Sequence, residues 1–144
     1  MKTISIKMIA ITVLMLLGLS ACSKDDSNPT ENNSTFVGTW KLTKLSALIG
    51  GTPMELTPEL AGTQMTIVAK ADNTFSMTTT DGAGTRTSTG TWSISGSQLT
   101  LKFSDGTSAT YEYSISGSLL KIKNYPYTHP TFGSLSITLD FTKQ

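Results

Sequence analysis

Residues 93–101 read SISGSQLTL, and residues 114–122 read SISGSLLKI. Each stretch ends one run of alternating polar and apolar residues, passes through a Ser-Gly pair and begins a second such run. Strict alternation is the pattern of a β-strand with one buried face, and a Ser-Gly pair between two such runs indicates a tight hairpin. The two copies therefore predict successive hairpins of an antiparallel meander, and two copies are too few for a solenoid or propeller.

The same alternation extends on both sides of these hairpins and divides most of the chain into about eight short strands. The predicted strands cover 37–46, 63–70, 74–80, 86–94, 98–104, 108–115, 119–124 and 134–142. Helical character is indicated at Thr57-Pro58-Glu59-Leu60, where threonine is a cap and proline takes the first helical position, and it amounts to little more than one turn.

A meander of about eight antiparallel strands usually closes on itself, because closure removes the exposed strand edges. We therefore expect an all-β domain, an eight-stranded antiparallel up-and-down barrel. The alternative is an immunoglobulin-like sandwich, which needs Greek-key crossings that tight sequential hairpins do not supply. The predicted domain, 36–144, is 109 residues long, enough for one domain with a modest core.

The N-terminal segment has the features of a secretory signal peptide. Lys2 and Lys7 precede a mainly apolar run over 8–17, which is shorter than the roughly 20 residues of a transmembrane helix. We predict a signal peptide over 1–21 and an acylated, flexible tether over 22–35. Removing the signal peptide changes the formal net charge from +1 to −1, and a nearly neutral chain argues against a nucleic-acid partner.

Cys22 is the single cysteine, so no disulfide can form within the chain. Leu19-Ser20-Ala21-Cys22 resembles the lipobox of bacterial lipoproteins, which implies a diacylglyceryl group on the Cys22 sulfur, palmitate or a similar acyl chain on the new amino terminus, and membrane anchoring. Ser23-Lys24-Asp25-Asp26 resembles the acidic signal that exports some Gram-negative lipoproteins to the cell surface. These resemblances imply an outer-membrane lipoprotein exposed at the surface; the alternatives are a buried free cysteine and a merely solvated linker.

Gly38-Thr39-Trp40 opens the first predicted strand, and residues 92–99 read WSISGSQL, a Trp-x-Ile-x-Gly-x-x-Leu pattern. Gly-x-Trp at this place is the lipocalin signature, and the chain from 36 to 144 resembles the bacterial lipocalin-like lipoproteins. The resemblance implies a barrel with Gly38, Trp40 and Trp92 in structural roles. Two features of classical lipocalins are absent: a Thr-Asp-Tyr motif between the sixth and seventh strands, and an arginine that caps the first tryptophan, for which Lys143 is the nearest substitute.

Groups suited to catalysis are scarce, with one histidine and one arginine in the whole chain. No nucleophile has a recognisable base near it in sequence, and no paired cysteines or histidines have metal-ligand spacing. We expect a protein that is not an enzyme and that uses no cofactor or metal.

Arg86 is the most informative single charge. If the alternation that points Trp92 inward continues back along the strand, Ser88 and Arg86 also face the barrel interior, where an arginine would suit a carboxylate. A bulge at Gly90 would instead turn Arg86 outward to water.

The two longest predicted connections, 47–62 and 125–133, lie at one end of the barrel, because connections of an up-and-down barrel alternate between its ends. Long connections in a compact domain are usually functional, so we expect a ligand site at this end, away from Trp40 and Trp92. The expected lining residues are Met65, Met77, Arg86, Ser88, Phe103, Ala109, Tyr111, Ile122, Leu135 and Ile137. The expected lid residues in the two connections are Leu48, Ile49, Met54, Leu56, Tyr125, Tyr127, His129 and Phe132.

Two functions fit this sequence. One is a lipid-anchored binding protein that holds a small, largely apolar or acidic molecule at the cell envelope. The other is a surface interaction or structural lipoprotein with a solid barrel, whose loops bind a protein or glycan partner. The volume of the barrel interior distinguishes the two functions, since a barrel of eight strands has room either for a filled core or for one small ligand.

Overall fold

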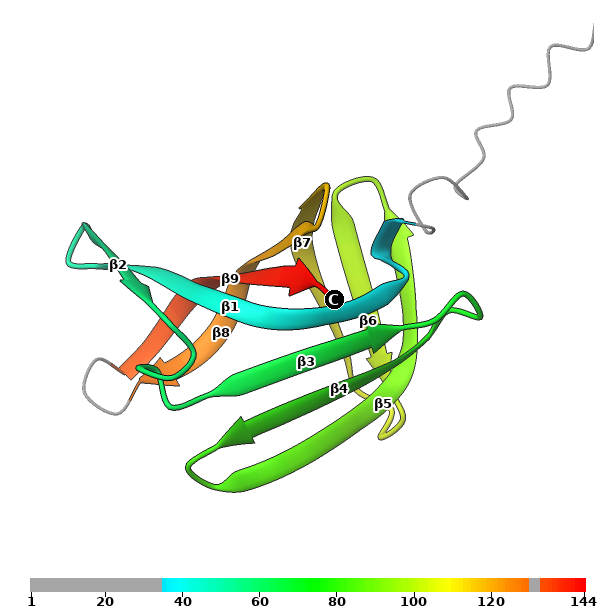
Figure 1. The fold of residues 1–144 in the computed structure, drawn as a ribbon, viewed down its shortest axis with the longest axis horizontal. Coiled ribbons are helices and arrows are strands. Elements are labelled where there is room, and N and C mark those ends of the chain that lie inside the picture. The colour runs from blue at the N-terminus through cyan, green and yellow to red at the C-terminus, as the bar shows by residue number, and fades with distance from the viewer. Residues whose placement is uncertain (1–34, 130–132) are drawn as a thin grey trace, which may run out of the picture.

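The computed structural model describes residues 35–129 and 133–144, and within them it places nine β-strands (Figure 1). Cys22, the signal peptide, the predicted tether up to residue 34 and Phe132 lie outside the described residues. The strands are β1 (Gly38–Ile49), β2 (Thr52–Leu56), β3 (Gln64–Ala69), β4 (Thr74–Asp81), β5 (Gly84–Ser95), β6 (Gln98–Phe103), β7 (Ser108–Ser116), β8 (Leu119–His129) and β9 (Gly133–Lys143).

Eight of these strands close into an antiparallel barrel. From β3 to β9 each strand pairs with the next one in sequence, β1 pairs with β3, and β9 returns to pair with β1. The closing register runs from Trp40 opposite Lys143 to Ala47 opposite Ile137. Since no connection crosses between two sheets, the predicted up-and-down barrel is confirmed and the immunoglobulin-like alternative is wrong.

The ninth strand, β2, corrects the prediction of a loop over 47–62. β1 continues to Ile49, the chain turns at Gly50 and Gly51, and β2 pairs back onto the far half of β1. The two glycines have φ of 59° and 84°, the positive values that a two-residue type I′ hairpin turn requires. The four expected lid residues of this segment are therefore strand residues: Leu48, Ile49, Met54 and Leu56.

A single hydrogen-bonded turn follows β2, as the sequence predicts. The Ala61 N–H donates to the Thr57 carbonyl oxygen at 3.0 Å, and the Leu60 N–H reaches the Thr57 hydroxyl at 3.4 Å. Thr57 thus caps the turn with both its backbone and its side chain.

The prediction of a loop over 125–133 is also wrong for most of its length. β8 reaches His129, so Tyr125, Tyr127 and His129 lie on a strand. Pro126 suggested a loop, but the pairing of β7 with β8 ends at Lys123, which leaves one edge of this part of β8 free. Proline is tolerated at such an edge because no ladder hydrogen bond is lost there.

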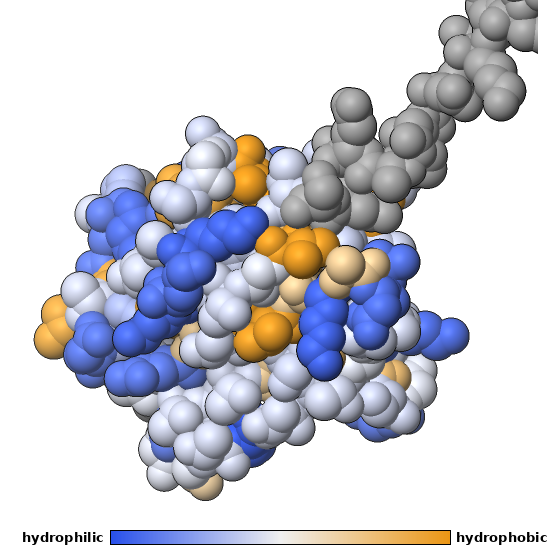
Figure 2. Space-filling view, turned by 45° about the vertical axis from the view of Figure 1, so that its right-hand side comes forward, coloured by the Kyte–Doolittle hydropathy of each residue, from blue (hydrophilic) through white to orange (hydrophobic). Residues whose placement is uncertain are grey.

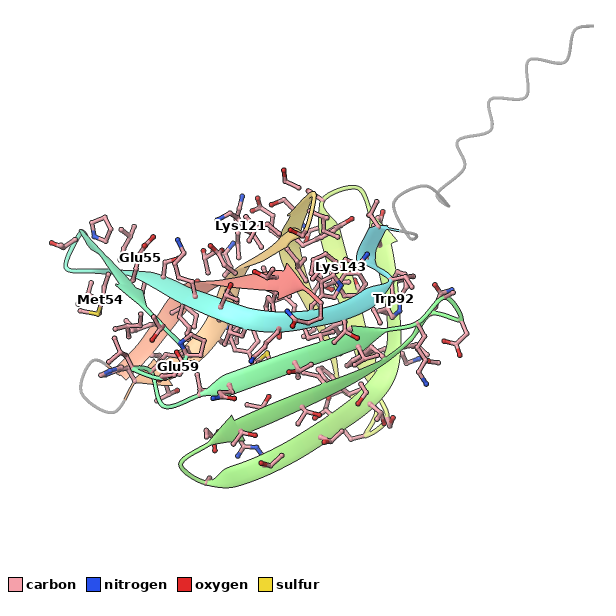
Figure 3. The ribbon with its side chains drawn as sticks, in the orientation of Figure 1. Met54, Glu55, Glu59, Trp92, Lys121 and Lys143 are labelled. Atoms are coloured by element: carbon pink, nitrogen blue, oxygen red, sulfur yellow. The ribbon has the colours of Figure 1, made fainter. Side chains whose placement is uncertain are left out.

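A packed core seals one end of the barrel. The Trp40 Nε1–H donates to the Phe36 carbonyl oxygen at 2.7 Å, and the Phe36 ring meets the Trp92 ring edge-on at 5.0 Å between centroids. All three side chains are buried. Lys143 Nζ lies 5.2 Å from the centre of the Trp40 ring, so Lys143 occupies the place expected for a capping cation. We call this the tryptophan end; Figure 3 shows Trp92 and Lys143 there.

Gly90 does not form the bulge that the sequence allowed. It pairs in unbroken register with Phe75 on β4 and Phe103 on β6. The inward alternation of β5 therefore continues from Trp92 through Ser88 to position 86.

One face of the described surface is mainly polar. The face drawn in Figure 2 carries scattered hydrophobic residues among hydrophilic and intermediate ones. Within the ranges 35–129 and 133–144, no helix has the length and apolar character needed to cross a membrane.

Candidate ligand-binding site

The end opposite the two tryptophans receives the β1–β2 hairpin, the turn before β3, the β4–β5 and β6–β7 connections, and the ends of β8 and β9 at which His129 pairs with Gly133. In Figure 1 the β1–β2 hairpin and the paired ends of β8 and β9 reach the same side of the molecule, and Figure 3 shows Met54 there, far from Trp92. We call this the open end.

A cavity of about 180 Å³ lies at the open end, and we call it the mouth cavity. Its apolar lining comes from β1, β3 and β9, and its polar lining from β4, β5, β8 and the residue before β3. The lining residues are Leu42, Leu45, Thr63, Met65, Thr79, Asp81, Arg86, Tyr125, Pro126, Tyr127, Thr128, Ile137 and Leu139. Because an engineered cavity of about 150 Å³ binds benzene, the mouth cavity has room for a ligand of that order of size.

The mouth cavity exists because β1 changes partner along its length. β1 pairs with β3 only as far as Lys41 and with β2 only from Leu45. A bulge in the pairing with β9 falls in the same place, between Leu42 and Lys44. Between the pairings with β3 and with β2, one edge of β1 has no partner strand. Leu42 and Leu45 lie at the two ends of this unpaired stretch, and both side chains line the mouth cavity.

A second, apolar space lies between the β1–β2 hairpin and the β8–β9 hairpin, and we call it the flap cavity. Its volume of about 20 Å³ is enough for one water-sized molecule. It shares Leu45, Tyr127 and Ile137 with the mouth cavity, so these three side chains separate the two spaces. The remaining lining residues are Ser46, Ala47, Ile49, Met54, Leu56, Ala61, His129 and Leu135.

Arg86 stands at the rim of the mouth cavity. Arg86 holds an inward-facing position of β5, opposite Thr79 on β4. Its side chain is nevertheless 63% exposed, because this part of β5 lies at the rim of the barrel. The Arg86 guanidinium donates a hydrogen bond to Asp81 Oδ2 at 2.5 Å. The other oxygen of the same carboxylate accepts the Ala83 N–H at 2.9 Å.

Two tyrosines stack beside this ion pair. The rings of Tyr111 and Tyr125 lie 5.5 Å apart with an interplanar angle of 29°. Burial raises the pKa of both phenols, while the positive charge of Arg86 acts in the opposite direction on Tyr125. Both phenols are therefore protonated at neutral pH, and Tyr125, which lines the mouth cavity, brings a neutral phenol to it.

The structure brings together part of the predicted site. Met65, Arg86 and Ile137 line the mouth cavity, and Leu135 lines the flap cavity. Tyr111 joins them through its stacking on Tyr125. The other predicted lining residues do not line either cavity: Met77, Ser88, Phe103 and Ala109, which are half-buried, and Ile122, which is buried in the core.

The predicted lid residues divide in the same way. Tyr125 and Tyr127 line the mouth cavity. Those that line the flap cavity are Ile49, Met54, Leu56, Tyr127 and His129. Leu48 does not cover the site, because it is 68% exposed and lines an outer groove with its cross-strand partner Pro53.

The sequence analysis missed Leu42, Leu45, Thr79 and Asp81. Asp81 lies just beyond the predicted strand 74–80, although it continues the alternation of Met77 and Thr79 on β4. That period of two was a signal that could have placed it beside Arg86. In the described part of the chain, no group of three or more histidine, cysteine or acidic side chains is arranged to hold a metal ion.

A closed eight-stranded antiparallel barrel with a cavity at one end defines a class of β-barrel whose interior can hold one small ligand. The lipocalin-like domain family matches residues 36–122, more than half of the chain, and the chain belongs to this family. No curated protein matches this chain.

Two solved structures are similar to this chain. One is a lipocalin-like protein from Bacteroides uniformis, with 15% sequence identity and a TM-score of 0.50, covering 76% of this chain and 99% of its own. The other is an uncharacterized protein from Bacteroides eggerthii, with 10% identity and a TM-score of 0.49, covering 75% of this chain and 98% of its own. At 15% identity the first likeness establishes the fold alone.

Proposed function

We propose that this protein is a non-enzymatic binding protein that holds one small, largely apolar molecule in the mouth cavity. The observation that carries the proposal is the cavity of about 180 Å³ at the open end of the barrel. Its apolar floor and the polar groups at its rim are the combination typical of small-molecule sites. Burial of ligand surface against Leu42, Leu45 and Leu139 would provide affinity, and the rim would orient the ligand.

We place this binding at the cell envelope, with Cys22 as the lipid anchor and the domain exposed at the outer surface of the outer membrane. The support is the lipobox-like sequence before Cys22 and the acidic residues that follow it. More than one acyl chain on the first residue would make the anchoring stable.

The test is native mass spectrometry of the protein purified from its own host. We expect a small molecule to remain bound to the wild type and to be absent from Thr79→Trp, which places an indole ring in the mouth cavity. Thr78→Trp is the matched control, because Thr78 faces outward and pairs with the Thr87 hydroxyl at 3.2 Å. Equal ligand occupancy in both variants would show that the molecule binds elsewhere.

A second function becomes the better one if no bound molecule is found. Among the described residues, the large exposed hydrophobic side chains are Leu48 on β1, Met54 on β2 and Leu60 in the turn before β3. Their shared location at the open end favours a protein or glycan partner that docks on the β1–β2 hairpin and the turn after it.

A further inference from the structure

The polar end of the mouth cavity is an ion pair and not a free arginine. We propose that Asp81 determines the specificity of this cavity. By pairing with Arg86, it makes the site prefer ligands whose polar end carries no net charge, such as a primary amide or a zwitterion. Ligands whose polar end is a lone carboxylate bind less tightly. This inference rests on the small-molecule binding proposed above and names the chemistry of the ligand's head group.

Asp81 is held in place by the hairpin on which it lies. It is the last residue of β4 and pairs with Gly84 across the β4–β5 turn. One carboxylate oxygen accepts the Ala83 N–H and the other accepts the Arg86 guanidinium. With both oxygens engaged and the side chain only 27% exposed, Asp81 stays beside Arg86 at the cavity rim.

The formal charges of this pair sum to zero. A carboxylate that approaches Arg86 also approaches the Asp81 carboxylate, so repulsion offsets much of the attraction. Among the residues described as lining the mouth cavity, Arg86 is the only cation, and the lining includes no second positive charge to compensate for an anion.

A ligand head group with both a hydrogen-bond donor and a hydrogen-bond acceptor is complementary to the Asp81–Arg86 pair. Arg86 has five N–H donors, so a ligand carbonyl can accept from one that Asp81 does not use. A ligand N–H can at the same time donate to Asp81. A primary amide meets both requirements, and so does an amino-acid zwitterion, whose carboxylate faces Arg86 and whose ammonium faces Asp81.

Tyr125 adds no positive charge that could offset the repulsion between a ligand carboxylate and Asp81. It lines the mouth cavity, and burial raises the pKa of its phenol, which remains neutral at pH 7. The preference therefore depends on the Asp81–Arg86 pair, and the Tyr125 hydroxyl can donate or accept one further hydrogen bond.

The test uses three probes with the same phenyl body: hydrocinnamide, hydrocinnamate and L-phenylalanine. Dissociation constants are measured at pH 7 by NMR titration of the wild type and of Asp81→Asn. We expect the wild type to bind hydrocinnamide and L-phenylalanine about tenfold more tightly than hydrocinnamate. In Asp81→Asn, which keeps an oxygen for the Ala83 N–H, hydrocinnamate binding should tighten about tenfold and L-phenylalanine binding should weaken.

Glu112→Gln is the matched control. Glu112 pairs with Lys123 on the outer face of β7 and β8, away from the cavity, so the ratio of the three affinities should not change. If Asp81→Asn does not fold, Arg86→Gln replaces it, and the proposal then requires the preference for hydrocinnamide over hydrocinnamate to increase.

Two outcomes would overturn the inference, and they differ. A wild type that prefers hydrocinnamate, with the same ratio in Asp81→Asn, contradicts the role of Asp81 while leaving small-molecule binding intact. Failure of all three probes to bind either folded protein overturns the mouth cavity as a ligand site, and the specificity proposal with it.

Discussion

Asp140 shows how one outward-facing residue holds the barrel closed. Its side chain is buried although its neighbours in sequence, Leu139 and Phe141, point into the core. Lys121 Nζ donates to both carboxylate oxygens at 3.1 and 3.0 Å, and Lys44 Nζ lies 3.5 Å from one of them. The two lysines come from β8 and β1, so Asp140 links the three strands at which the barrel closes.

We expect Asp140→Asn to lower the free energy of unfolding by about 2 kcal/mol, because it removes charge-assisted hydrogen bonds from a buried group. Urea denaturation of both proteins measures this. The control is Glu112→Gln, which breaks an exposed pair with Lys123 and should cost at most about 1 kcal/mol. Equal losses in the two variants would mean that the Asp140 cluster has no special role in closure.

At the scale of the element, β5 depends on one position without a side chain. A Cβ built on Gly90 would lie 2.0 Å from the Lys102 carbonyl oxygen and 2.9 Å from the Phe103 Cα. The same close approach of β6 lets the Phe103 ring meet the Phe75 ring edge-on at 5.5 Å. Gly90 is thus required by the approach of a neighbouring backbone rather than by a turn.

Gly90→Ala should therefore destabilise the domain by about 3 kcal/mol, since β6 must move to make room for the methyl group. Thermal or urea unfolding provides the measurement. Gly82→Ala is the control, because a Cβ there meets nothing within 4 Å and the substitution should change stability by at most about 0.5 kcal/mol. A Gly90→Ala protein as stable as the control would contradict the close approach of β6.

Strands with both edges paired were predictable from the sequence, and strands with a free edge were not. Alternation predicted β3 to β7 to within two residues, because each pairs on both sides and must keep one face in the core. Pro53 on β2 and Pro126 on β8 broke the local pattern, yet each lies where one strand edge is free. Only the pairing of distant segments shows that a proline is tolerated there.

The candidate site was predictable only in part for a related reason. The inward-facing side of a single strand follows from its period, and in β5 that period continues unbroken from Trp92 to Arg86 at the open end. The gap that forms the mouth cavity depends instead on where β1 leaves β3 and joins β2. Local pattern carries no information about that point, so Leu42 and Leu45 were not predicted.

At the scale of the whole molecule, the two ends of the barrel have different constructions. The tryptophan end is sealed by Phe36, Trp40 and Trp92, and the described chain begins beside them at Thr35. The open end carries the mouth cavity and the exposed side chains of Leu48 and Leu60. If the chain is anchored in a membrane upstream of residue 35, the mouth cavity would therefore lie at the end of the barrel away from the bilayer.

The lipid anchor assigned to Cys22 provides the last prediction. In the native host, Cys22→Ser should yield an uncleaved precursor without palmitate, because the sulfur is the group that accepts the lipid in the lipoproteins that this segment resembles. Radioactive palmitate labelling and the mass of the chain measure the two effects. Replacement of Lys24, Asp25 and Asp26 by alanine is the comparison, since it should keep the label and the cleavage but remove accessibility to external protease. Palmitate on the Cys22→Ser protein would contradict the anchor, whereas unchanged protease accessibility of the triple variant would contradict only the export signal.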